Sequence, residues 1–384
     1  MHGDRPALQR NPFVTAPAST RLLSLDVMRG LTIILMVVVN TAAWFGVRDD
    51  TATFSFLLHA KWAGVTFADV VFPFFILIVG VSIPLSGVAD RRQDGVNGAL
   101  VARLLRRAAI LFAIGLALNA MALLSSGGDT LRIPGVLQRI AVVFFVASLL
   151  YACLPQRALV AVVVVSLFGY WRLAYLDVPD GTPVDLLQPG ADFISWVDRQ
   201  VLGEAAYVSG PRGYDPEGLL DTIPAIAQAL IGVLVGSWMR THGDRERAFR
   251  GMLSAGVALS LLGWAWGLSF PMVKALWTSS FAVYTSGLGL VLFAVLYWLV
   301  DNRGYRSAWL VPCQSFGINS ITAYVLHILL TGMLMSAGLL PLCYELAAPV
   351  VGPRPASLAP IAMVLLLTWL PLRALHVRQI VIKV

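Results

Sequence analysis

Charged residues are scarce in this 384-residue chain. They make up 13% of it, and 58% of the residues are hydrophobic, whereas a soluble domain has about 25% charged residues. A soluble protein of this length needs more polar surface than that to cover its core. The scarcity therefore excludes an ordinary soluble domain and favours a protein whose outer surface faces lipid.

Cysteine is also scarce, and the common metal-binding and nucleotide-binding motifs are missing. Cys153, Cys313 and Cys343 have no CxxC spacing, so they indicate neither a disulfide framework nor a zinc site. The sequence contains no P-loop, GxGxxG or HExxH pattern, and we expect no bound metal. The net charge of +7 comes from loops beside apolar segments, which indicates membrane topology and does not predict nucleic-acid binding.

The apolar residues occur in runs of about 20, the length at which a helix crosses the hydrocarbon core of a bilayer. Strands of a β-barrel would instead alternate over about ten residues. The sequence therefore predicts an all-α fold, a polytopic transmembrane helix bundle of about ten spans in the lipid bilayer. The predicted spans are 25–47, 67–87, 104–124, 135–154, 158–175, 219–239, 251–270, 279–299, 314–338 and 357–372.

Lysine and arginine are distributed unevenly between the predicted loops. With the N-terminus inside, 18 of them lie on the cytoplasmic side and seven on the other side, so the positive-inside rule predicts that both termini are cytoplasmic. We expect residues 1–23 to form a disordered cytoplasmic arm without a signal peptide, and residues 24–384 to form the transmembrane domain. Its one large periplasmic loop, 176–218, is acidic and aromatic. It is either a solvated cap or a lid that binds a polyhydroxylated or cationic substrate.

Polar groups inside a bilayer are costly, so each is a candidate functional residue. His59 lies on the predicted periplasmic side and Asp69 begins the next span. A histidine can transfer a proton near neutral pH, and Asp69 could orient its ring. Asn40, near the same end of the first span, could donate to a developing oxyanion. The structural alternatives are an interfacial belt residue for His59 and a helix–helix contact for Asn40.

Basic side chains also enter or border the predicted spans. Arg139, which follows Gln138, needs either a carboxylate or a bound anion as its partner. A phosphate-bearing cofactor is one candidate, and Asp26 or Asp221 is the alternative. Arg29 lies three residues after Asp26, on the same helical face, so the two could form an ion pair at the cytoplasmic rim.

Two further patterns concern helix packing. Ser320, Tyr324 and His327 follow one another at i, i+4 and i+7 and form one polar stripe. The stripe either lines a polar cavity or proton path or makes interhelical hydrogen bonds. The segments GVLVG (232–236) and GWAWG (263–267) fit close helix packing, within the bundle or between subunits.

Several long blocks resemble the heparan-α-glucosaminide N-acetyltransferase family, and most closely its bacterial members. They run from the first to the eighth span in the family's order. The blocks are SLDVMRGLTIILMVVVN (24–40), HAKWAGVTFADVVFPFFILIVGVSI (59–83), RIPGVLQRIAV (132–142), YDPEGLLDTIPAI (214–226) and KALWTSSF (274–281).

The resemblance implies a multi-pass protein of the bacterial inner membrane that transfers acetyl from cytoplasmic acetyl-CoA to the amine of a glucosamine-type sugar. The active histidine of the family falls on His59 and its nearby asparagine on Asn40. The sequence departs from the animal members because it lacks their long N-terminal lumenal domain and extra span, and it has Ala63 where other members often have asparagine. A free or oligomeric amino sugar is therefore expected as the acceptor.

Together, these patterns predict a site. His59, as a general base or as an acetyl carrier, with Asn40 and Asp69, would form the catalytic group. The residues expected to bind the CoA phosphates are Arg29, Arg106, Arg139 and Gln138, and those expected to bind the acceptor are Trp62, Asp215 and Glu217. The alternatives are an amino-sugar or oligosaccharide transporter and an O-acyltransferase of an envelope glycan. The glycine motifs permit a homodimer, which the animal members form.

Overall fold

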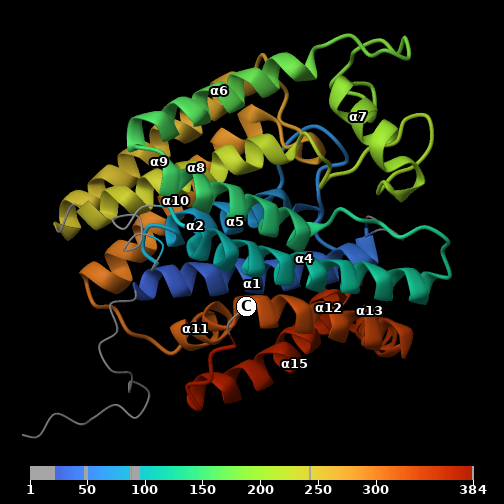
Figure 1. Cartoon of the computed structure of the whole chain (residues 1–384). Coiled ribbons are helices and arrows are strands. Elements are labelled where there is room, and N and C mark those ends of the chain that lie inside the picture. The colour runs from blue at the N-terminus through green and yellow to red at the C-terminus, as the bar shows by residue number, and fades with distance from the viewer. Residues whose placement is uncertain (1–21, 47–50, 87, 89–95, 242–243, 383–384) are drawn as a thin grey trace, which may run out of the picture.

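The structure is a computed structural model that describes residues 22–46, 51–86, 88, 96–241 and 244–382 (Figure 1). Residues 1–21, most of the predicted cytoplasmic arm, lie outside the described residues. Within the described ranges all regular elements are helical, and the only β pairing there is in two isolated bridges. The predicted all-α fold is confirmed.

Nine of the ten predicted spans correspond to single helices. They are α1 (Leu23–Gly46), α2 (Phe67–Ser82), α4 (Gly98–Ser126), α5 (Val136–Cys153), α6 (Gln156–Ala174), α8 (Thr222–Thr241), α9 (Arg245–Gly267), α10 (Ser279–Tyr297) and α15 (Leu358–Val377). The predicted loop at 176–218 also contains a helix, α7 (Phe193–Leu202). A short apolar helix that the sequence did not predict, α13 (Leu339–Val351), precedes the four-residue helix α14 (Pro353–Ala356).

The remaining predicted span, 314–338, is broken. It consists of α11 (Leu310–Ile318) and α12 (Ser320–Ser336), whose axes differ in direction by 94°. Among the described residues eight helices are long and apolar enough to cross a membrane, or nine if this bent pair counts as one span. The helix α2 has 16 residues and is shorter than predicted, because Pro84 lacks the N–H that the next helical hydrogen bond needs. The chain is thus a multi-pass membrane protein.

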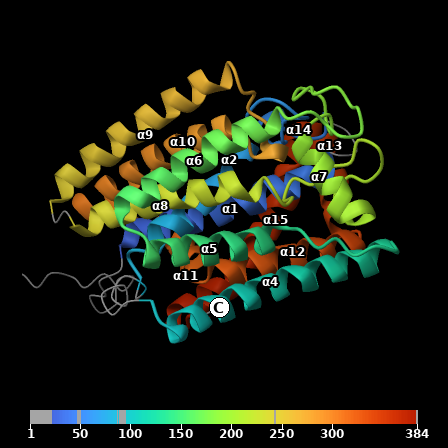
Figure 2. The ribbon, with the colours of Figure 1, turned by 45° about the horizontal axis from the view of Figure 1, so that its top comes forward.

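The helices lie side by side in layers (Figures 1 and 2). The helix α2 packs against α1, α8 and α10, and most of its side chains are buried. In contrast, only 17% of the apolar window of α4 and 22% of that of α9 is buried, as expected for helices that face lipid. The helix α7 lies near the last residues of α1 and the first residues of α2, and we call this end of the bundle the α7 end. The other end is called the opposite end.

Glycines allow the central helices to pack so closely that their backbones are in contact. A Cβ atom on Gly80 of α2 would lie 1.9 Å from the carbonyl oxygen of Ala229, and one on Gly232 of α8 would lie 2.2 Å from that of Leu77. Gly263 of α9 is similarly close to Tyr284 of α10. The two glycine motifs of the sequence therefore pack helices within the chain, and the homodimer stays a prediction.

We expect Gly80→Ala to destabilise the protein by about 1–3 kcal/mol, because the new methyl group overlaps backbone that cannot move aside. Thermal unfolding in detergent measures the change. Gly332→Ala is the matched control, since a Cβ there meets nothing within 4 Å and alanine favours the helix. Equal unfolding temperatures for the two variants would contradict the close α2–α8 contact.

Candidate active site

His59 and Asp69 are hydrogen-bonded at the α7 end. The Nδ1 atom of His59 lies 2.8 Å from Oδ1 of Asp69, whose side chain is completely buried. The other carboxylate oxygen accepts hydrogen bonds from the backbone N–H groups of Ala60 and Thr66 and from the Thr66 hydroxyl. Because a carboxylate only accepts, Nδ1 of His59 donates and Nε2 carries the lone pair. The ring is 40% exposed, so Nε2 is accessible to a reactant.

Lys274 contacts both members of this pair. It begins the short helix η3 (Lys274–Leu276) between α9 and α10, and its Nζ atom lies 3.0 Å from Nδ1 and 3.1 Å from Nε2 of His59. Nζ is 3.8 Å from Oδ1 of Asp69. Lys274 was not among the predicted site residues, because no local pattern places residue 274 beside residue 59.

A backbone contact between two loops holds Lys274 in place. Ala63 and Val273 form an antiparallel bridge, and the N–H of Gly64 donates to the carbonyl oxygen of Met272 at 2.9 Å. The residues that precede Lys274 are thus attached directly to the loop that carries His59. Burial lowers the pKa of Lys274 below that of a free lysine, while Asp69 and Glu217 favour its charged form and Arg139 opposes it.

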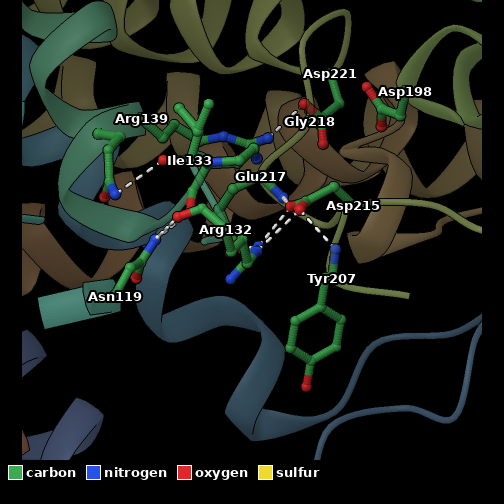
Figure 3. A network of polar contacts seen from close by, with 12 residues as sticks. Asn119, Arg132, Ile133, Arg139, Asp198, Tyr207, Asp215, Glu217, Gly218 and Asp221 are labelled. Atoms are coloured by element: carbon green, nitrogen blue, oxygen red, sulfur yellow. Dashed lines mark hydrogen bonds and ion pairs between the residues drawn. The ribbon is translucent and has the colours of Figure 1, made fainter. Parts of the chain in front are cut away.

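Asp215 and Glu217, predicted to bind the acceptor, are both paired with Arg132 (Figure 3). Arg132 donates to the two oxygens of Asp215 at 2.9 and 2.5 Å and to Glu217 at 2.6 Å. Burial opposes the charge of Arg132, but the two carboxylates raise its pKa above the ordinary value. Asp215 is buried and also accepts the backbone N–H of Tyr207, so it anchors its loop. Glu217 keeps 13% of its side chain exposed and acts electrostatically on Lys274.

Trp62, the third predicted acceptor residue, is buried beneath the loop that contains α7. Its Nε1 atom donates to the carbonyl oxygen of Leu186 at 3.0 Å, and its ring meets that of Tyr214 edge-on at 4.9 Å. These contacts of Trp62 fix the loop over the segment that carries His59.

The helix α7 is attached to the chain before α8 by Asp198. This carboxylate accepts the backbone N–H of Leu219 at 3.0 Å, and burial raises its pKa to about 6.

Arg139 and Gln138 lie in the first turn of α5, at the α7 end, and both make internal contacts; Figure 3 shows Arg139 beside Asp221. Arg139 forms an ion pair with Asp221, and each of these side chains is 1% exposed. Its guanidinium also lies over the ring of Trp277, 5.0 Å from the centroid. Gln138 donates to the carbonyl oxygen of Ile133 at 3.0 Å. For Arg139 the structure shows the carboxylate alternative, because a buried cation needs a fixed counter-charge. The phosphate contacts predicted for Arg139 and Gln138 stay predictions.

Asn40 is hydrogen-bonded to His327. The amide nitrogen of Asn40 lies 3.2 Å from Nε2 of His327, which is buried in α12, and Tyr324 packs edge-on against the same ring at 5.2 Å. Part of the predicted polar stripe on α12 thus serves interhelical hydrogen bonding, while Ser320 lines a cavity. The hydrogen bond that the structure gives Asn40 is to His327 and not to His59.

A cavity of about 590 Å³ opens at the opposite end, a volume typical of small-molecule sites. Arg29 and Arg107 line it. Phe75 and Phe144, which lie near the middle of α2 and α5, also line it. Arg29 forms the predicted ion pair with Asp26 at 3.0 Å. Arg106 does not line the cavity, because the next residue of a helix points about 100° away. The phosphate-binding role predicted for Arg106 stays a prediction.

The break between α11 and α12 borders this cavity. Asn319, at the break, donates to the carbonyl oxygen of Ile380 at 3.0 Å and accepts the N–H of Ile382 at 2.8 Å. These two bonds hold the last described residues against the break. As a result Val381 and Ile382 form part of the cavity wall together with Ser320.

Comparison with known proteins agrees with the blocks quoted above. A family model described as heparan-alpha-glucosaminide N-acetyltransferase, catalytic, matches residues 21–265. The chain belongs to this family. It is 30% identical over 361 residues to the human heparan-alpha-glucosaminide N-acetyltransferase, covering 80% of this chain and 52% of the relative. It is 28% identical over 369 residues to the mouse protein, covering 82% and 54%. The chain thus spans about half the length of these relatives. Lys274 lies beyond the residues that the family model matches.

We expect Arg139→Met to destabilise the protein by about 3–5 kcal/mol, because it leaves Asp221 buried without its partner. The double variant Arg139→Met/Asp221→Leu should recover most of this loss, as thermal unfolding in detergent would show. Arg250→Met, which breaks an exposed pair with Glu246 on α9, is the control and should have little effect. Losses that simply add in the double variant would contradict a direct Arg139–Asp221 interaction.

Proposed function

We propose that the chain is an acetyltransferase of the bacterial inner membrane that moves acetyl from acetyl-CoA to the amine of a glucosamine-type sugar. The observation that carries the proposal is the His59–Asp69 hydrogen bond at the α7 end, within a chain of this family. The distribution of lysine and arginine supports a periplasmic α7 end. The acceptor then approaches from the periplasm and acetyl-CoA from the cytoplasm.

The chemistry requires a neutral amine, whereas a sugar amine is largely protonated near neutral pH. The amine first loses one proton to water and binds in its neutral form. In the proposed reaction Nε2 of His59 then accepts a proton from the nitrogen as it attacks, while Asp69 holds Nδ1. The amine nitrogen bonds to the acetyl carbon, the carbon–sulfur bond breaks, and the proton on His59 passes to the departing sulfur. A two-step route through an acetyl group on His59 gives the same products. An amine and a thioester become an amide and a thiol.

The cavity at the opposite end suits the donor. Its basic residues, Arg29 and Arg107, can bind the phosphates of CoA, and its apolar side chains extend toward the middle of the bundle. Ser82 and Asp69 are 13 residues apart on α2, a rise of about 20 Å. An extended phosphopantetheine arm is of comparable length, so a donor bound at one end can present its thioester near the other.

Replacement of His59 tests the function. We expect His59→Ala to lower the rate of acetyl transfer from labelled acetyl-CoA to glucosamine or chitosan oligomers by at least about 100-fold, because the general base is lost. Lys61→Ala, an exposed position on the same loop, should keep the activity. Vesicle uptake of the sugar without acetyl transfer, equal in wild type and His59→Ala, would instead support a transporter. Product acetylated on oxygen would support an O-acyltransferase.

Replacement of Arg107 tests the donor site. We expect Arg107→Ala to raise KM for acetyl-CoA about tenfold or more with little change in kcat, since it removes a charged hydrogen bond to phosphate. The variant should behave like wild type with S-acetylpantetheine, which has no phosphate. Arg106→Ala, its neighbour on α4, is the matched control. An equal effect of both substitutions, or an effect that persists with S-acetylpantetheine, would argue against phosphate binding by Arg107.

A further inference from the structure

A second charged group, besides Asp69, contacts the ring of His59. Nε2 carries the lone pair because Nδ1 donates to Asp69, and Nζ of Lys274 lies 3.0 Å from Nδ1 and 3.1 Å from Nε2. An ammonium nitrogen at nearly equal distances from both ring nitrogens lies over the ring and leaves the in-plane lone pair of Nε2 open to a reactant. The contact joins loops that are 215 residues apart in the sequence.

We propose that Lys274 is a catalytic residue, whose ammonium group opposes a positive charge on His59 before the reaction and stabilises the negative charge on the acetyl oxygen during it. The inference rests on the proposed function and adds a residue to its site. It concerns the reacting atoms themselves, since Nζ contacts both ring nitrogens of His59.

The first role follows from the charges around the ring. A carboxylate beside a histidine favours the protonated imidazolium form, and Asp69 is in direct contact with Nδ1. A base must be unprotonated before it can act. The positive charge of Lys274, within 3.1 Å of the ring, repels a second positive charge there and so acts in the direction opposite to that of Asp69.

The second role follows from the chemistry of the thioester. When the amine attacks, the carbonyl oxygen becomes negatively charged, and a donor held nearby stabilises that charge. As Nε2 takes the proton from the amine, the imidazolium repels the ammonium group of Lys274, which turns toward the oxygen. When the carbon–sulfur bond breaks, the carbonyl re-forms and the proton on His59 passes to sulfur. Lys274 ends the cycle with the protons it began with.

Carboxylates and backbone contacts hold Lys274 in position. Burial lowers its pKa, while Asp69 and Glu217 favour its charged form and Arg139 opposes it. The Val273–Ala63 bridge holds the backbone just before it. The segment just after it is fixed by Trp277, whose Nε1 atom donates to Gln228 at 2.9 Å.

Two variants of the full-length protein separate the catalytic role of Lys274 from simple neutralisation of Asp69. Lys274→Met keeps the length of the side chain and removes the charge, whereas Lys274→Arg keeps the charge. We expect Lys274→Met to lower kcat about 100-fold or more with little change in KM for acetyl-CoA. In the plot of kcat against pH, the acidic limb of Lys274→Met should move to higher pH by about one unit, because the charge that opposes protonation of His59 is gone. Lys274→Arg should keep much more activity than Lys274→Met. Its plot should lose the alkaline limb, since arginine does not titrate.

A second measurement does not depend on acetyl transfer. Diethyl pyrocarbonate modifies neutral histidine, so peptide mass spectrometry of His59 against pH reports its protonation directly. The half-modification pH should rise in Lys274→Met and stay near the wild-type value in Lys274→Arg, with thermal unfolding as the control for folding.

An unchanged half-modification pH in folded Lys274→Met would overturn the first role. A kcat near that of wild type, or an equal loss in both variants, would overturn the second. If instead the wild-type protein acetylates no amine, while the pH of half-modification of His59 by diethyl pyrocarbonate shifts as expected, the proposed acetyltransferase function fails and the His59–Lys274 coupling stands.

Discussion

A carboxylate buried at the start of α2 governs the arrangement of the α7 end. Asp69 has no exposed surface, and a buried charge is tolerated only when other groups neutralise and hydrogen-bond it. Here the partners come from His59 and Thr66 on the preceding loop and from Lys274 before α10. The need to satisfy one acid therefore brings a histidine and a lysine from distant segments into contact. Any route that folds this end correctly also assembles the reactive group.

Features that depend on local sequence could be predicted. The long apolar runs gave nearly all the spanning helices, because hydropathy and length suffice for a helix in lipid. The His59–Asp69 contact was also accessible, since only ten residues separate the two and Asp69 stands at the start of a helix. The Asp26–Arg29 pair followed from helical spacing. In each case the partners lie on one element or on two consecutive ones.

Contacts between distant segments could not be predicted from one sequence. Asn40 meets His327 across 287 residues, and nothing in either helix specifies which polar group it will face. Arg139 showed that it needed a counter-ion, but the choice between an acid and a ligand depended on how α5 and α8 pack. A cluster of arginines does not show which side of α4 faces the cavity, and it is Arg107 that lines it. Packing decides these cases, and hydropathy carries no information about it.

The attachment of Ile380 and Ile382 to Asn319 has a consequence for handling the protein. Because these residues form part of the cavity wall, limited proteolysis that removes segment 380–382 takes away part of that wall while the helices of the bundle remain. The intact mass of a preparation therefore bears directly on the state of the cavity.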